Sequence, residues 1–272
     1  MKKQILLFTL LIASGCGPNV HKASPLSATG NNAIVGGEVA DNAIFAKHVV
    51  AIYNRDFKYW CTGTLISNDT VLTAAHCLNN GTRFSYQLIF SKYPRASEQT
   101  TRPIADLKYH LDYQPATVNH RNDIGILRIK GSLPPGFAPM DLPTAKDVEL
   151  KERNFYAAGY GVTTAKRGNP SDSGILRYTA QQIVGSPINS SQSQFYVNQR
   201  NGRGICFGDS GGPAFMKFDN RRVVVGIASA VYAPSSVGKG REDYDICRYD
   251  AIYTSVFHYL DWIAKASVEI HR

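Results

Sequence analysis

The sequence predicts an all-β protein from three observations. Eight short runs of β-forming residues recur along the chain, and turn signals such as Asn79-Asn80-Gly81 separate them. Near the C-terminus, Val256, Leu260 and Ile263 have the spacing of one helix. Short strands divided by turns are typical of a β-sandwich or a β-barrel. The predicted strands cover residues 49–53, 62–66, 86–90, 124–129, 155–158, 194–197, 223–228 and 251–255.

Residues 1–15 have the pattern of an export signal. Lys2 and Lys3 precede an apolar run over residues 5–13, which is too short to span a bilayer as a helix. The sequence ASGC that ends at Cys16 resembles a bacterial lipobox, in which the cysteine is lipidated, although Ala13 replaces the usual leucine. A lipoprotein signal with Cys16 as the lipidated residue and an ordinary cleavable secretory signal are the two alternatives.

The cysteine count agrees with export. The chain has five cysteines, and an exported protein is expected to pair them. Cys61, Cys77, Cys206 and Cys247 can form two disulfides within the C-terminal body. Cys16 is then the odd residue, either lipidated or a free thiol.

Residues 16–33 are predicted to form a linker or propeptide. They are rich in Ser, Asn, Gly, Ala and Pro and cannot bury enough apolar surface to fold. The composition changes at residue 34, and residues 34–272 are long enough for one domain with a substantial core.

The stretch CFGDSGGP over residues 206–213 is a candidate nucleophile loop. Ser210 lies between small residues and directly follows an acid. Glycines permit positive φ, so backbone N–H groups can converge on the oxyanion that forms during acyl transfer. The alternative is an ordinary glycine-rich surface turn.

This loop resembles that of the trypsin/chymotrypsin family of serine peptidases, and three further motifs follow the family's chain order. TAAHC contains His76, NDIGIL contains Asp123, and AAGYG contains Tyr160, where the family usually has tryptophan. Together with the export signal, the motifs identify the chain as resembling a bacterial exported member. The resemblance implies two six-stranded antiparallel β-barrels with the active site between them and a C-terminal helix.

The resemblance also implies a catalytic triad. Ser210 would attack a peptide carbonyl, His76 would accept its proton, and Asp123 would orient His76. The backbone N–H groups of Gly208 and Ser210 would form the oxyanion hole. No metal or organic cofactor is required. The disulfides expected from the family are Cys61–Cys77 and Cys206–Cys247.

Activation is expected to follow a cut between Ala33 and Ile34. The sequence IVGG from Ile34 resembles the start of an activated family member, whose new α-amino group pairs with the acid before the nucleophile, here Asp209. Losing one member of a buried ion pair costs roughly 3–5 kcal/mol, so such a pair can hold the loop in its working shape. Ala33 is not Lys or Arg, which favours an activator that is not trypsin-like, or the enzyme itself.

Four residues are expected to bind substrate. Counting from the family's motifs places Gly204 at the floor of the primary pocket, Val231 and Ala251 at its walls, and Ser229 along the substrate backbone. Because Gly204 carries no charge and the walls carry side chains, we expect cleavage after small or medium apolar residues. Asp250, next to the wall, would restore a basic preference if it turned inward.

The net charge of the chain excludes few classes of partner. The net charge is +9, and residues 34–272 carry +6. Such an excess is compatible with an anionic envelope surface or acidic proteins as partners, and also with a plain solvated surface. No nucleic-acid motif is present, and no calcium loop is expected because Glu98 is the only acid between Arg83 and Arg102.

The sequence therefore predicts an exported, monomeric serine endopeptidase that is made as a zymogen and acts on protein or peptide substrates.

 

Two other functions are compatible with the same motifs. One is an inactive member of the fold that binds a partner, although such proteins usually lose the histidine or the serine, and here His76, Asp123 and Ser210 are all present. The other is an esterase-like hydrolase that keeps the acyl-enzyme chemistry but turns over few peptides.

Overall fold

The structure is a computed structural model of the chain. It describes residues 34–41, 43–97, 99–114, 121–147, 154–166, 172–184, 192–218, 220–237, 240 and 244–272. The chain divides into two compact units, Met1–Asn31 and Asn32–Arg272, and the described residues all belong to the second. The predicted signal, Cys16 and the linker to Ala33 lie outside them. Within the described residues, no helix is long and apolar enough to cross a membrane.

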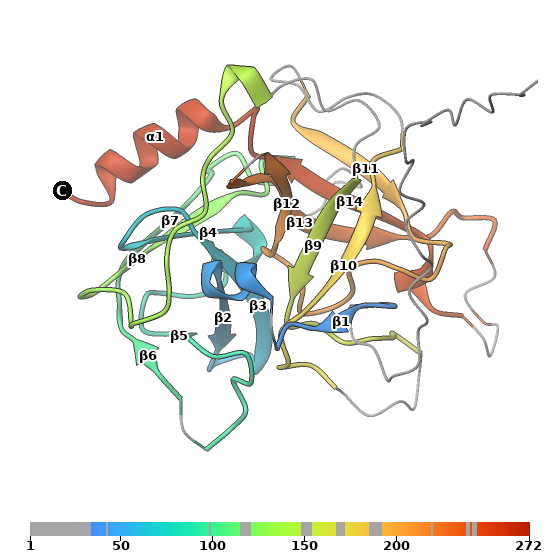
Figure 1. The fold of residues 1–272 in the computed structure, drawn as a ribbon, viewed down its shortest axis with the longest axis horizontal. Helices are drawn as coiled ribbons and strands as arrows, with labels where there is room; N and C mark the ends of the chain where they lie inside the picture. Colours follow the sequence, from blue (N-terminus) through green and yellow to red (C-terminus); the bar gives the residue numbers. More distant parts are fainter. Residues whose placement is uncertain are drawn as a thin grey trace, which may run out of the picture. The chain divides into compact units, whose positions relative to one another are not determined.

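The described strands form two antiparallel sheets of seven strands each (Figure 1). The first sheet has the order β6-β5-β2-β3-β4-β8-β7 and the second has the order β1-β10-β9-β12-β13-β14-β11. The first contains β2 (Val49–Asn54), β3 (Tyr59–Leu65), β4 (Thr70–Thr73), β5 (Tyr86–Ile89), β6 (Thr101–Arg102), β7 (Ile104–Tyr109) and β8 (Gly125–Ile129). The second contains β1 (Glu38–Val39), β9 (Asn154–Gly159), β10 (Arg177–Gln182), β11 (Gln194–Asn198), β12 (Pro213–Phe218), β13 (Arg221–Tyr232) and β14 (Asp250–Ser255).

This architecture confirms the predicted all-β, chymotrypsin-like fold. All eight predicted strands are present within a few residues of their expected bounds. Each sheet has seven strands instead of the expected six because the two-residue strands β1 and β6 each add one to the count. Besides these two short strands, β4, β7, β10 and β12 were not predicted from the sequence.

The first sheet closes on itself through one kinked stretch. β6 pairs with β5, and β7 pairs with β8, at the opposite end of the strand order. Only Pro103 separates β6 from β7. Because proline lacks the N–H that a strand interior must donate, it suits the point at which the stretch leaves one partner for the other.

The buried apolar residues form two large clusters, and the first of them contains residues of both sheets. The first cluster includes Leu65, Leu72 and Leu88, all fully buried. The second is rich in aromatic side chains, and the rings of Phe195 and Tyr253 stack with their centroids 5.1 Å apart. Strand pairing fixes which residues of each strand point inward, because successive side chains alternate between the two faces.

Tyr160 ties the end of β9 to the first sheet. Its side chain is fully buried, and its hydroxyl donates to the carbonyl oxygen of Ser91 at 2.9 Å. Its backbone N–H donates to the Thr62 hydroxyl on β3 at 3.1 Å. The tyrosine at this position therefore links the two sheets by hydrogen bonds as well as by packing.

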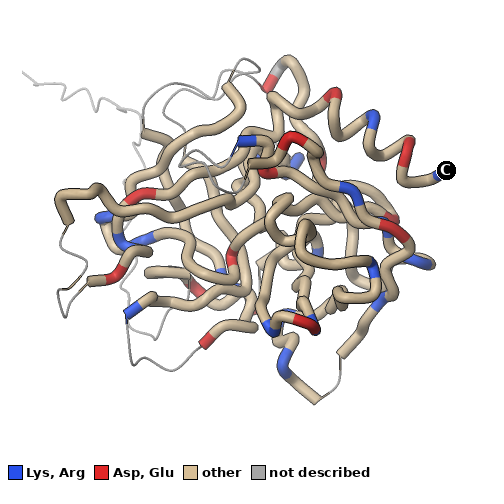
Figure 2. Tube along the Cα trace, turned by 180° about the vertical axis from the view of Figure 1, so that it is seen from behind, with Lys and Arg blue, Asp and Glu red and all other residues tan. Residues whose placement is uncertain are grey.

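The predicted C-terminal helix is α1 (Leu260–Glu269), and it is confirmed. Ile263 and Ala266 form its buried side. Figure 2 shows acidic and basic residues alternating along the helix, and Lys108 on β7 forms a 2.9 Å ion pair with Glu269. The helix thus packs by an apolar stripe and is charged where it faces solvent.

Candidate active site

His76 lies in a short 3-10 helix, Ala75–Cys77, that follows β4 directly. A disulfide between Cys77 and Cys61 of β3 fixes this turn, with a Cα–Cα distance of 6.2 Å. The Cys61 and Cys77 sulfur atoms and a His76 ring nitrogen lie within 4.8 Å of one another. Because both sulfurs are in the disulfide, they do not offer the thiolates that a metal would need. The turn therefore positions an imidazole without forming a metal site there.

Asp123 accepts two hydrogen bonds from His76. The ring nitrogen Nδ1 lies 2.8 Å from Oδ2 of Asp123, and the backbone N–H of His76 donates to Oδ1 at 2.9 Å. Asp123 is fully buried, whereas the His76 side chain is 27% exposed. A carboxylate on Nδ1 leaves Nε2 as the ring nitrogen that faces the cavity, as a general base requires.

The second sheet also holds Asp123. The hydroxyl of Ser229 on β13 donates to Oδ2 of Asp123 at 2.5 Å. The hydroxyl of Thr254 on β14 donates to the Asp123 backbone carbonyl at 3.0 Å. Asp123 is therefore fixed by contacts from both sheets, and Ser229 has a role that the sequence analysis did not assign to it.

The two groups shift each other's pKa in opposite directions. Burial acts to lower the pKa of His76, but the charge of Asp123 and the hydrogen bond to it raise that pKa above its ordinary value. Burial acts to raise the pKa of Asp123, but His76 and the Ser229 hydroxyl lower it overall. The pair therefore favours an ionised carboxylate beside an imidazole that readily holds a proton.

The loop that carries Ser210 is held against the first sheet. Thr62 on β3 donates its backbone N–H to the Ser210 carbonyl at 2.8 Å and its hydroxyl to the Gly208 carbonyl at 3.0 Å. Gly208 has φ of +99°, and a Cβ there would lie 2.8 Å from the Cα of Gly161. Only glycine fits this position without strain.

The two predicted oxyanion-hole amides have no backbone acceptor among the described residues. Among the residues that the structure describes, neither Gly208 nor Ser210 donates its backbone N–H to another described residue. The disulfide Cys206–Cys247, confirmed with a Cα–Cα distance of 5.2 Å, anchors the start of the same loop.

Asp209 is a second buried carboxylate, and it lacks a salt bridge to any described residue. Its two oxygens accept the backbone N–H groups of Gly161 and Cys206, both at 2.8 Å. Burial raises the pKa of Asp209 to about 7, and these hydrogen bonds and the charge of Arg177 only partly oppose that rise. Ile34 is also fully buried, in a segment whose Val35 pairs with Gly204.

A cavity of about 390 Å³ lies on one side of Ser210. Of the four predicted substrate-binding residues, Ser229 and Val231 line it. Ala251 is buried and is the cross-strand partner of Val231. Gly204 is buried and does not line the cavity, and a Cβ built on it would meet the side chain of Gln199 at 2.0 Å.

Gln199 occupies the space next to Gly204, the residue predicted from the sequence to form the floor of the primary pocket. It is fully buried, accepts the N–H of Ile205 at 2.7 Å, and donates to the carbonyls of Ile205 and Cys247. The side-chain amide of Gln181 donates to it at 3.2 Å. An uncharged, hydrogen-bonded glutamine therefore lies against Gly204 and binds Ile205, which lines this cavity.

The carboxylate of Asp250 is paired with an arginine and is not a free negative charge at the pocket wall. Its carboxylate lies 3.4 Å from the guanidinium of Arg200. Ala251 next to it is buried, and neighbouring strand residues point to opposite faces. The Asp250 side chain therefore lies on the face of the sheet opposite to that of Ala251.

A second cavity, of about 510 Å³, is also lined by Ser210, together with residues of the first sheet and its loops that include Tyr59, Trp60 and Asn79. Tyr113 and Phe207 line both cavities. The sequence analysis missed these two aromatic residues. Phe207 could have been predicted, because it directly precedes Gly208 in the predicted nucleophile loop. Nothing near Tyr113 in the sequence indicates a site.

Replacing Asp123 with asparagine should lower the pKa of His76. The substitution removes the charge that raises this pKa and leaves the burial that lowers it. NMR titration of the His76 ring in a Ser210→Ala background measures the value. Asp250→Asn, which removes a carboxylate paired with Arg200, is the matched control and should leave the His76 titration unchanged. An equal His76 pKa with and without Asp123 contradicts the coupling.

Comparisons with known proteins agree with this geometry. The family model described as trypsin matches residues 34–263. Brachyurin of Leptuca pugilator is 30% identical over 85% of this chain and 96% of its own length, and trypsin beta of Drosophila erecta is 27% identical over 85% and 87%. Ovochymase of Halocynthia roretzi is 25% identical over 94% of this chain, which spans only 16% of that protein. The chain belongs to the trypsin family of serine endopeptidases.

Proposed function

We propose that this chain is an exported endopeptidase, made as a zymogen, that hydrolyses peptide bonds through Ser210, His76 and Asp123. The observation that carries the proposal is the buried Asp123 carboxylate, bound to His76 and Ser229 beside the cavity that Ser210 lines. Family membership supports the peptidase activity, and this geometry supports the assignment of its residues.

The chemistry follows from the three side chains. Ser210 Oγ attacks the peptide carbonyl while Nε2 of His76 takes its proton, and Asp123 stabilises the imidazolium. The oxygen of the carbonyl becomes negative and accepts the N–H groups of Gly208 and Ser210. His76 then protonates the leaving amine, and water releases the acyl group from Ser210 by the reverse steps.

Two features of the uncut chain support activation by a cut before Ile34. Asp209 is buried with a raised pKa and no salt bridge among described residues, so a new cation beside it would be strongly stabilising. Ile34, a β-branched residue, has φ of +46°. That region costs about 1–3 kcal/mol, and a cut removes the peptide bond that imposes it.

The proposal that the chain is exported is based on the sequence of residues 1–15. It includes two alternatives, a lipoprotein signal and an ordinary secretory signal. If Cys16 is lipidated, as in a bacterial lipoprotein, the chain is anchored at the cell envelope until the cut after Ala33 releases residues 34–272. Both disulfides join residues of the body, so neither of them would retain the tail. If residues 1–15 are an ordinary signal, the precursor is secreted directly.

The cavity beside Ser210 supports specificity for small or medium apolar residues. Val231 narrows it, the buried Ala251 lies beside Val231 across the strands, and the neutral Gln199 lies against Gly204. Asp250, the acid next to Ala251 in the chain, is paired with Arg200. A Lys or Arg side chain would therefore be buried without a partner, which is costly.

Ser210→Ala should abolish peptide hydrolysis by the activated chain. Loss of the nucleophile of a triad lowers turnover on the order of 10⁶-fold. Hydrolysis of a quenched fluorescent peptide measures the effect, and Ser132→Ala, an exposed serine outside both cavities, is the control. Activity retained in Ser210→Ala would contradict the assignment.

The precursor should lose stability as the pH rises, whereas the cut form should not. The raised pKa of Asp209 means that the folded precursor holds a proton that the unfolded chain releases. This stabilisation is complete below about pH 4 and is lost as the pH rises through about 7. In the cut form, the α-amino group of Ile34 would hold Asp209 ionised and remove that loss.

Chemical unfolding of two forms of the Ser210→Ala chain measures this difference. One form is the precursor that keeps its N-terminal tail, and the other begins at Ile34. Above about pH 7 the form beginning at Ile34 should be the more stable by several kcal/mol. Acetylation of its α-amino group should abolish the gain. Equal stability of the two forms at every pH would contradict the Ile34–Asp209 pair.

A peptide panel tests the specificity. The activated chain should cleave faster after Ala, Val or Leu than after Lys or Arg, and Val231→Gly should shift the preference towards larger apolar residues. One methylene in an apolar pocket changes binding by roughly 1–3 kcal/mol, so the shift is about tenfold or more. Val237→Gly, outside the cavity, is the control. Faster cleavage after Arg than after Ala would overturn the pocket assignment.

A further inference from the structure

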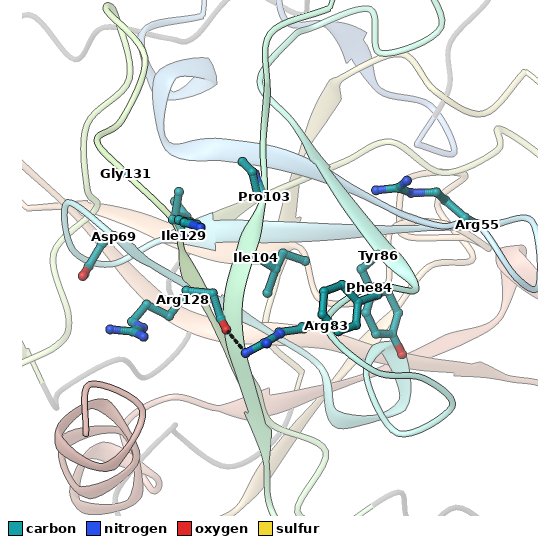
Figure 3. Close-up of a pocket in the computed structure, with 12 residues that line it drawn as sticks. Arg55, Asp69, Arg83, Phe84, Tyr86, Pro103, Ile104, Arg128, Ile129 and Gly131 are labelled. Atoms are coloured by element: carbon teal, nitrogen blue, oxygen red, sulfur yellow. Dashed lines mark hydrogen bonds between the residues drawn. The ribbon is translucent and has the colours of Figure 1, made fainter.

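A cavity of about 750 Å³ on the first sheet is larger than either cavity beside Ser210. It lies where β5, the β6–β7 kink and the end of β8 come together, and Figure 3 shows Arg55 and Arg128 at opposite ends of it. We call it the basic groove. The side chains that carry the argument are Arg55, Arg83, Phe84, Ile104, Arg128 and Lys130.

The groove has an uncompensated positive charge. Four of its lining residues are Lys or Arg, and within the described residues none of the four forms an ion pair. The Nε of Arg128 is buried without a hydrogen-bond partner. Asp69, the acid in the lining, is already engaged, since it lies 2.7 Å from a ring nitrogen of His271. The charge of the groove therefore matches an anionic ligand.

The groove is also apolar between its charges. Phe84 is 74% exposed, and the guanidinium of Arg83 lies over its ring at 4.8 Å. Ile104 lies between the two ends of the groove (Figure 3). A sulfated glycan would match the cations but would leave this apolar surface uncovered. An acidic polypeptide with an aromatic or aliphatic side chain matches both features.

Two chain segments connect the basic groove to the active site. Arg55 begins the β2–β3 hairpin turn, and its other arm carries Tyr59 and Trp60, which line the second cavity beside Ser210. Asn79 lines that same cavity, and Phe84, a few residues along the chain, lines the groove. The groove and the second cavity thus lie at opposite ends of the same two segments.

The second cavity shares Ser210 with the one that Ser229 and Val231 line, but Tyr59 and Trp60 in its lining belong to β3 of the first sheet. If that first cavity holds the residue before the cleaved bond, the second holds residues after it. A substrate that continues along the hairpin reaches the groove with its C-terminal portion.

We propose that the basic groove binds an acidic segment of the protein substrate, containing an aromatic or aliphatic residue, several residues C-terminal to the cleaved bond. This rests on the proposed function for the direction in which substrate crosses the active site. The groove would select among protein substrates that share the same residues at the cleaved bond.

The test uses four peptides with one cleavable core. The first is the core alone. The second carries a C-terminal extension of Asp and Glu with one Phe, the third replaces its acids with Asn and Gln, and the fourth carries the acidic extension at the N-terminus. The groove variant is Arg55→Gln/Lys130→Gln. The matched control is Lys217→Gln/Arg222→Gln, which removes the same charge from the second sheet.

The activated wild-type chain should cleave the C-terminally acidic peptide with a kcat/KM about tenfold above that of its Asn/Gln counterpart. This is the effect expected if Arg55 and Lys130 each form one exposed ion pair of modest strength with the peptide. The groove variant should lose this preference, the control should keep it, and all three should cleave the core equally. High salt should reduce the preference by screening. Equal cleavage of the acidic and neutral peptides, an equal loss in the control, or an equal gain from the N-terminal extension would overturn the proposal.

Binding to the Ser210→Ala chain separates this proposal from the proposed function. A fluorescent peptide consisting of the acidic extension alone should bind, and the groove substitutions should weaken its binding about tenfold. If no chain cleaves the core, the proposed function fails, and this binding still decides the groove. Absence of binding, or binding of a sulfated oligosaccharide in place of the acidic peptide, would overturn the groove assignment.

Discussion

The carboxylate of Asp123 is the point on which the two sheets depend. A buried charge is stable only when it is paired and hydrogen-bonded, and Asp123 obtains its partners from both sheets. His76 comes from the turn after β4, and Ser229 and Thr254 come from β13 and β14. Displacing one sheet relative to the other would leave this charge unsatisfied. Fold stability and the geometry of the site are therefore coupled through one side chain.

Asp209 is a second buried acid, and its pKa is shifted in the direction opposite to that of Asp123. Both acids are fully buried, but the imidazole beside Asp123 lowers its pKa, whereas burial raises the pKa of Asp209 to about 7. The glycines of the AAGYG motif pack against Asp209, because a Cβ on Gly159 would lie 2.3 Å from its Oδ1. The backbone around Asp209 fits closely to its carboxylate, which has no salt bridge to a described residue. Activation, in this account, supplies a cation from the chain itself.

The sequence predicted the parts of the fold and site that are local in the chain. The alternating strands, the helix spacing of Ile263 and the four motifs each lie within a dozen residues, so their patterns are readable. The missed strands lack such a pattern: β12 begins at a proline, and β10 buries Arg177 and Gln181, which normally indicate an exposed strand. Gln199 and the basic groove arise only from tertiary packing of residues distant in sequence.

The central claim is that Ser210, His76 and Asp123 form one active site that a cut before Ile34 switches on. The most direct measurement is the rate at which a fluorophosphonate forms a covalent adduct, followed by intact mass and located by peptide mapping. The account predicts an adduct on Ser210 that forms at least about a hundredfold faster after the cut, consistent with the roughly 3–5 kcal/mol of a buried ion pair, and none in His76→Ala. An adduct on another residue, or the same rate before and after the cut, would contradict it.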